Sequence, residues 1–100
     1  ARAILAILPG TQKEAGVTVY HFANEGTASW YDLATAVMEI AGLPCRVNPI
    51  FTSQYPTKAT RPAYSVFDLS LIKTKKGVEI PYWRKSLVLT INKLQSDKKN

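Results

Sequence analysis

The chain has 100 residues, 46% of them hydrophobic and 20% charged, as is typical of one small globular domain. No apolar run approaches the roughly 18 residues that a membrane span needs, so we expect no transmembrane segment. The single cysteine, Cys45, excludes an internal disulfide framework and favours a reducing, cytoplasmic setting. One cysteine and one histidine also cannot complete a tetrahedral zinc site.

The net charge of +6 is unevenly distributed along the chain. Residues 1–55 hold three cations and four anions, whereas residues 56–100 hold ten cations and three anions. A basic half suits a phosphorylated or polyanionic partner. The alternative, a solvated lysine-rich surface, accounts for the same charges.

Two elements are predicted before residue 27. Ile4, Ile7 and Leu8 recur at helical spacing, which predicts a helix over residues 1–8 that ends at Pro9-Gly10. The β-branched and aromatic residues of segment 17–22 predict a strand, followed by turn chemistry at residues 24–26.

The strongest helix signal follows this turn. Ser29 is a candidate N-cap, and Asp32 occupies the position of its capping-box partner. Gly42 stands where a helix C-terminus favours glycine, and Pro44 follows shortly after it. The apolar stripe between these ends comprises Leu33, Val37, Ile40 and Ala41.

The second half of the chain predicts shorter elements. Residues 47–51 favour an edge strand, residues 52–62 a surface loop, and residues 64–67 a short strand. A brief helix, capped by Asp68 or Ser70, is predicted to end at Gly77. A last helix is predicted over residues 82–94. The expected fold is an α/β (α+β) domain over residues 1–95, with about three short strands and three to four helices and a frayed tail over residues 96–100.

The residue types that carry catalysis are sparse. The sequence has no Gly-x-Gly-x-x-Gly, Gly-x-x-x-x-Gly-Lys, Gly-x-Ser-x-Gly or His-Glu-x-x-His motif. His21 lies in a predicted strand and favours a half-buried structural role. Cys45 follows Pro44 at a predicted helix-to-strand connection, which favours a packing role over a nucleophilic one.

The segment 55–68 is richer in binding chemistry. Pro62 biases Arg61 to an extended backbone, which suits a bidentate contact to phosphate or carboxylate. Tyr64 and neighbouring hydroxyls add hydrogen-bonding groups. A structural role, in which Arg61 ties its loop to a nearby carboxylate or carbonyl, is left open by the residues alone.

Blocks of sequence in a fixed order carry a family resemblance. The blocks are Gly16-Val-Thr-Val-Tyr-His-Phe-Ala-Asn-Glu-Gly26, Ala28-Ser-Trp-Tyr-Asp-Leu-Ala34, Tyr55-Pro-Thr, Arg61-Pro-Ala-Tyr-Ser-Val-Phe-Asp68, and Gly77-Val-Glu-Ile-Pro-Tyr-Trp83 with Ser86-Leu87. With these blocks the chain resembles the C-terminal portion of dTDP-4-dehydrorhamnose reductases, which belong to the extended short-chain dehydrogenase type.

This resemblance implies a substrate-binding lobe of a Rossmann-type reductase. The parent enzyme would reduce dTDP-4-dehydro-L-rhamnose to dTDP-L-rhamnose with NADPH or NADH, for bacterial polysaccharide. The family's Gly-rich loop and Tyr-x-x-x-Lys pair belong to an N-terminal Rossmann domain, and neither motif occurs in this chain. The chain by itself is therefore expected to hold no cofactor and to be inactive.

The resemblance also assigns site residues and partners. Arg61 would contact the nucleotide or its diphosphate, with Tyr64 beside it, and Trp30 would line the sugar side or else pack at its helix's first turn. Some members of the family hold magnesium with glutamates. Glu79 is a conceivable match to one of these magnesium ligands. The implied partners are a dTDP-sugar, the protein's own Rossmann domain and a second copy of the parent, with no nucleic acid and no membrane.

Two other functions are consistent with the residues. A small basic nucleic-acid-binding module would explain the charge of the second half, although no stacking platform or recognition helix is evident. A ligand-free interaction domain would explain the lack of catalytic motifs.

Overall fold

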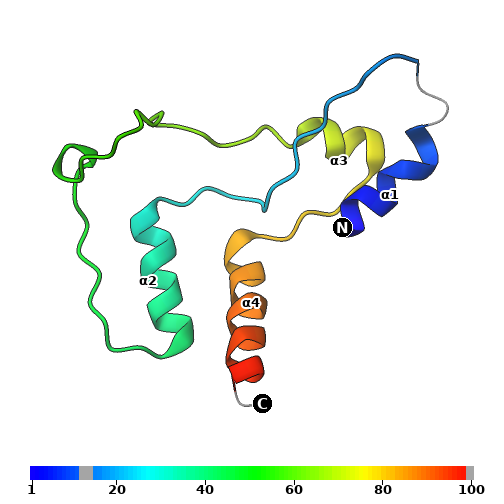
Figure 1. Cartoon of the computed structure of the whole chain (residues 1–100). Helices are drawn as coiled ribbons and strands as arrows, with labels where there is room; N and C mark the ends of the chain where they lie inside the picture. Colours follow the sequence, from blue (N-terminus) through cyan, green and yellow to red (C-terminus); the bar gives the residue numbers. More distant parts are fainter. Residues whose placement is uncertain (12–14, 99–100) are drawn as a thin grey trace.

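The computed structural model describes residues 1–11 and 15–98 (Figure 1). Within them the chain forms four α-helices and a short 3-10 helix, and no helix is long and apolar enough to cross a membrane. The elements are α1 (Arg2–Thr11), α2 (Trp30–Ala41), η1 (Thr52–Gln54), α3 (Ser70–Lys76) and α4 (Trp83–Lys98).

Helix α2 confirms the sequence prediction at both ends. The Ser29 hydroxyl accepts a hydrogen bond from the Asp32 backbone N–H at 3.0 Å, and the Asp32 carboxylate accepts one from the Ser29 N–H at 2.9 Å. These bonds form a capping box that satisfies two backbone donors at the helix start. Gly42 closes the helix in the left-handed conformation, with φ of 68°.

The prediction of about three strands is wrong for the described part of the chain. No strand forms in the three predicted segments, 17–22, 47–51 and 64–67. Among the described residues, the β-type pairing is limited to one isolated parallel bridge between Glu25 and Tyr82. Side-chain preferences favour an extended backbone, but a strand also needs a neighbour that exchanges backbone hydrogen bonds with it. The described residues supply no such neighbour to these segments.

The Glu25–Tyr82 bridge sets the arrangement of the two longest helices. The Glu25 N–H donates to the Pro81 carbonyl at 2.9 Å, and the Trp83 N–H donates to the Glu25 carbonyl at 3.0 Å. From this junction α2 and α4 run side by side in the same direction (Figure 1). At their far ends the Gln95 side chain donates to the Ala41 carbonyl at 3.2 Å.

The other helices differ from prediction at their ends. Helix α1 continues through Pro9 to Thr11, because a proline in the last turn removes one intrahelical hydrogen bond without ending the helix there. Helix α3 ends at Gly77 as predicted. Helix α4 reaches Lys98 rather than residue 94, because no glycine or proline interrupts its polar end.

The chain is open and buries little apolar surface. In the described residues the buried hydrophobic side chains are Ala36, Leu69, Ile72 and Ile91. The accessible surface is 8780 Å², whereas a compact protein of this mass exposes about 5,700 Å². The radius of gyration is 17.7 Å, against about 13 Å for a compact 100-residue domain. The chain therefore lacks the burial that usually stabilises a domain of its length.

We predict that Gly26→Ala destabilises the junction between the two long helices. Gly26 has φ of +95°, and an added Cβ would lie 2.5 Å from Tyr82 Cε2. Gly16 is the matched control because it has φ of +80° but open space around it. Gly26→Ala should lower the free energy of unfolding by about 1–3 kcal/mol more than Gly16→Ala, as measured by urea unfolding followed by tryptophan fluorescence. Equal losses in the two variants would contradict this role of the junction.

The capping box predicts a pH-dependent stability of α2. Hydrogen bonding from the Ser29 backbone, and secondly from its side chain, lowers the pKa of Asp32 below its ordinary value. The folded-state pKa of Asp32 is thus below its unfolded value, so its stabilisation is complete above the unfolded pKa and lost as pH falls through the folded pKa. Ser29→Ala keeps the backbone donor and should raise the Asp32 pKa only part of the way to normal. A ¹³C NMR titration of the carboxylate tests this, and an unchanged Asp32 pKa in the variant would contradict it.

Candidate functional site

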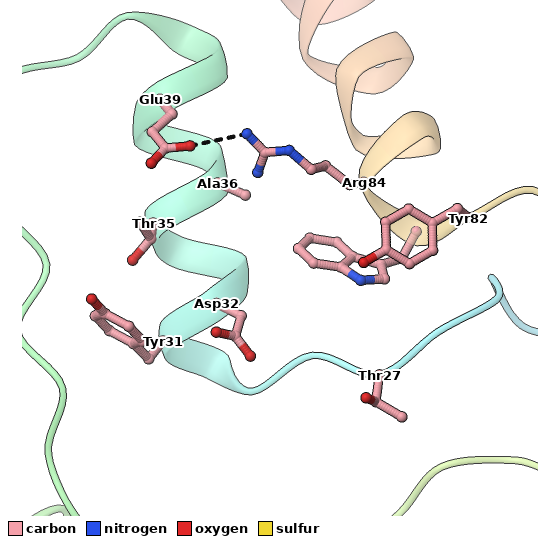
Figure 2. A pocket seen from close by; sticks show the side chains of 9 residues that line it. Thr27, Tyr31, Asp32, Thr35, Ala36, Glu39, Tyr82 and Arg84 are labelled. Atoms are coloured by element: carbon pink, nitrogen blue, oxygen red, sulfur yellow. Dashed lines mark hydrogen bonds and ion pairs between the residues drawn. The ribbon is translucent and has the colours of Figure 1, made fainter.

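Helices α2 and α4 border a polar pocket of about 350 Å³ beside their junction (Figure 2). Figure 2 shows Asp32 and Ala36 on the side of α2 that faces the start of α4. Tyr82 and Arg84 lie at that start. The lining residues are Thr27, Tyr31, Asp32, Thr35, Ala36, Glu39, Tyr82, Trp83 and Arg84.

The charges of this pocket are partly balanced. Arg84 pairs with Glu39 at 2.9 Å, and both side chains are largely exposed. Asp32 adds a second carboxylate, which is ionised at neutral pH, and hydrogen bonds from Ser29 lower its pKa further below the ordinary value. With two carboxylates and one guanidinium, the pocket carries an excess negative charge. It therefore suits a neutral hydrogen-bonding group better than a diphosphate.

Two polar atoms of the pocket wall are buried without a hydrogen-bond partner in the described structure. They are the Thr35 hydroxyl oxygen and Trp83 Nε1. Thr35 lies with Tyr31 on the edge of α2 away from Arg84 (Figure 2). Buried polar atoms normally have partners, and water or a group from outside these residues has to supply them.

A smaller pocket of about 170 Å³ lies along the same edge of α2. Met38, Leu43, Cys45 and Val47 contribute to its wall. Cys45 is exposed, and its sulfur lies 3.9 Å from the Arg46 carbonyl oxygen. No cation or histidine is among the residues that line this pocket.

The three site residues predicted from the sequence lie outside both pockets. Arg61 and Tyr64 belong to the exposed segment between η1 and α3, and Trp30 is the first residue of α2. Tyr64 and Trp30 are 75% and 81% exposed. The described residues give Arg61 no hydrogen bond or ion pair, so it is not tied to its own loop as the structural alternative required.

The Arg61 segment leads to a more ordered region. Asp68 accepts a hydrogen bond from the Ser70 N–H at 2.9 Å, and this bond lowers the pKa of Asp68. His21 stacks on Phe67 with ring centroids 4.8 Å apart. His21 is exposed rather than half-buried as predicted, because its segment has no sheet to cover it. No local sequence pattern indicates this contact, since 46 positions separate the two rings.

Neither implied cofactor fits the described residues alone. No group of three or more histidine, cysteine, aspartate or glutamate side chains that could hold a metal is found among residues 1–11 and 15–98, so Glu79 lacks the further ligands that magnesium needs. The sequence also lacks the glycine-rich loop that holds a nicotinamide dinucleotide.

Comparisons with known proteins agree with the resemblance. The family model described as the RmlD substrate binding domain matches residues 1–96. The chain is 41% identical over 69 residues to the spore coat polysaccharide biosynthesis protein SpsK of Bacillus subtilis, covering 69% of this chain and 24% of that protein. It is 40% identical over 76 residues to the dTDP-4-dehydrorhamnose reductase of Aggregatibacter actinomycetemcomitans, covering 69% of this chain and 26% of that enzyme.

A third relative covers more of the chain. The dTDP-4-dehydrorhamnose reductase of Mycobacterium tuberculosis is 34% identical over 94 residues, which are 91% of this chain and 29% of that enzyme. No solved structure matches significantly. The chain spans about a quarter of the length of the curated relatives it matches. Because the family model covers nearly all of its residues, the chain belongs to the RmlD substrate binding domain family.

Proposed function

We propose that this chain binds the sugar nucleotide in a dTDP-4-dehydrorhamnose reductase. The complete protein would reduce dTDP-4-dehydro-L-rhamnose to dTDP-L-rhamnose, the activated sugar for a surface polysaccharide. The match of the RmlD substrate binding domain to residues 1–96 carries this proposal. The names of the relatives support it, since several are dTDP-4-dehydrorhamnose reductases and one acts in polysaccharide biosynthesis.

We assign the diphosphate to the loop that carries Arg61. A diphosphate needs a cation with several donors in a fixed geometry, and a guanidinium provides them. The Arg61 side chain has no partner in the described residues and is exposed, so it is available to a ligand. The pocket between α2 and α4 is a poorer place for a diphosphate, because Asp32 and Glu39 outweigh Arg84 there.

Tyr64 and Trp30 complete the proposed contact set. Both aromatic side chains are largely exposed, Tyr64 beside the Arg61 loop and Trp30 at the start of α2. Tyr64 would donate its hydroxyl to the ligand, and the indole of Trp30 would cover an apolar face of the sugar. These roles need both residues to meet at one cleft, which closes when the rest of the protein is present.

The cofactor and the proton donor would be supplied outside this chain. We propose an N-terminal Rossmann domain that holds NADPH or NADH, because this sequence has neither its glycine-rich loop nor a Tyr-x-x-x-Lys pair. The isolated chain would then be inactive. We place the complete enzyme in the cytoplasm, where such cofactors are available and a lone exposed Cys45 stays reduced. A homodimer of the complete protein is compatible with this arrangement.

The direct test exchanges the matching segments of two proteins. The aligned residues, which are 91% of this chain, would replace the matching segment of the Mycobacterium tuberculosis reductase. We expect the chimera to oxidise NADPH when it is given dTDP-4-dehydro-L-rhamnose, whereas the 100-residue chain alone should not. A chimera that folds by circular dichroism and binds NADPH, yet neither binds the dTDP-sugar nor turns it over, would refute the proposed function.

The role of Arg61 is tested in the same chimera. Arg61→Ala should raise KM for the dTDP-sugar by about tenfold or more, because hydrogen bonds to a charged group contribute about 1.5–3 kcal/mol. Arg46→Ala is the matched control, since Arg46 is also exposed but lies outside the proposed contact set. Steady-state kinetics measure both variants. If Arg61→Ala leaves KM unchanged, or if Arg46→Ala raises it equally, the assignment of Arg61 is wrong.

A further inference from the structure

The pocket between α2 and α4 holds one donor and one charge that the described residues leave unmatched. Trp83 Nε1 is buried without a hydrogen-bond partner, and an indole N–H can only donate. Asp32 accepts a hydrogen bond from the Ser29 N–H, but the described ion pairs do not include its carboxylate. The other carboxylate of the pocket, Glu39, is paired with Arg84 at 2.9 Å. Asp32 therefore carries the excess negative charge of the pocket.

Contacts outside the pocket hold these two groups in place. The capping box fixes the Asp32 side chain at the start of α2, on the side that faces the start of α4 (Figure 2). The Trp83 backbone N–H donates to the Glu25 carbonyl at 3.0 Å, which fixes the first residue of α4. The rings of Tyr82 and Trp83 lie 5.7 Å apart between their centroids and are inclined by 50°. The pocket thus offers ordered polar groups beside two aromatic rings, which lowers the entropic cost of binding.

The unmatched groups select one chemical class of ligand. An anion is disfavoured by the unpaired Asp32 carboxylate, and a simple ammonium ion leaves Trp83 Nε1 without an acceptor. A compound that carries both an ammonium group and hydroxyl groups satisfies both, because the ammonium donates to the carboxylate and a hydroxyl oxygen accepts from the indole. Aromatic rings also attract an ammonium group.

The pocket volume limits the size of this ligand. About 350 Å³ lies at the lower end of the roughly 300–1,000 Å³ that is usual for small-molecule sites. Tyr31 and Tyr82 in its wall are 41% and 51% exposed, so a ligand can enter from solvent without a movement of the helices. A compound with a single ring fits these dimensions.

We infer that this pocket binds a small hydroxylated ammonium compound of the size of one amino sugar. Its ammonium group pairs with Asp32, one of its hydroxyl oxygens accepts the Trp83 Nε1 hydrogen, and the Tyr82 ring covers its apolar face. The Glu39–Arg84 pair borders the site without binding the ammonium group. This inference goes beyond the proposed function, because Arg61, Tyr64 and Trp30 do not line the pocket.

Three probes that share a pyranose ring test the ligand class. Glucosamine carries an ammonium group, methyl glucoside is neutral, and glucuronate is an anion. Each is titrated into the ¹⁵N-labelled 100-residue chain, whose two tryptophans give two indole N–H signals in NMR spectra. Trp83→Phe identifies the Trp83 signal by its loss, and the Trp30 signal is the internal reference because Trp30 lies outside the pocket.

We expect glucosamine to shift the Trp83 indole signal in a saturable way and to leave the Trp30 signal in place. Its Kd should be at least about tenfold lower than that of glucuronate, with methyl glucoside between them, because a hydrogen bond to a charged group contributes more than a neutral one. Equal binding of the three probes, or tighter binding of glucuronate, would overturn the inference.

A pair of variants at the capping box tests the contact with Asp32. Asp32→Asn removes the charge and should raise the Kd of glucosamine about tenfold. Ser29→Ala is the matched control, because it removes one bond of the same capping box and keeps the Asp32 carboxylate. Its Kd should change by less than about twofold. Equal weakening in the two variants would assign the effect to the helix end and contradict the contact with Asp32.

The same titration in the chimera described above covers an isolated chain whose two long helices separate in solution. The exchanged segment contains the whole pocket, since only 9% of this chain lies outside the alignment. Glucosamine binding in a chimera without reductase activity would retain this inference and reject the proposed function. The inference is overturned if the Trp83 signal shows no saturable shift in either protein, whatever the reductase activity of the chimera.

Discussion

The parallel bridge between Glu25 and Tyr82 is the contact on which the arrangement of this chain depends. Its two backbone hydrogen bonds bring together segments 57 positions apart, and α2 and α4 begin within a few residues of it. Gly26 allows the close approach, because a Cβ at that position would collide with the Tyr82 ring. The polar pocket exists because the two helices leave this junction side by side in the same direction.

Outside this junction the chain has few contacts that could hold it in one shape. Small domains bury a smaller fraction of their surface than large ones, and this chain buries less than a compact domain of equal mass. The extended segments are therefore left largely exposed. The three proposed binding residues, Arg61, Tyr64 and Trp30, are likewise exposed, and the described residues do not gather them into one cleft.

The chemistry of the two candidate binding regions differs in a way that assigns their roles. The Arg61 loop offers a cation without a competing carboxylate among its described hydrogen bonds and ion pairs. The pocket between the helices pairs its one guanidinium with Glu39 and holds Asp32 as well. We therefore propose the first region for a diphosphate, because the excess negative charge of the second disfavours one.

Local signals predicted the helices well. Ser29, Asp32 and Gly42 identified α2 because capping bonds and the left-handed glycine involve residues within four positions of each other. The ordered blocks also identified the family, which the match over residues 1–96 confirmed. The strands were predicted from composition alone, and composition cannot say whether a neighbouring strand is present.

By itself, then, the sequence determined both ends of α2, the end of α3 and the family. Tertiary structure alone decided that Glu25 meets Tyr82, that His21 stacks on Phe67, and that α2 and α4 enclose a pocket. The physical reason is the range of the interactions. Caps and helical periodicity act between near neighbours in the chain, whereas bridges, ring stacks and pockets join distant segments whose meeting depends on the whole path of the backbone.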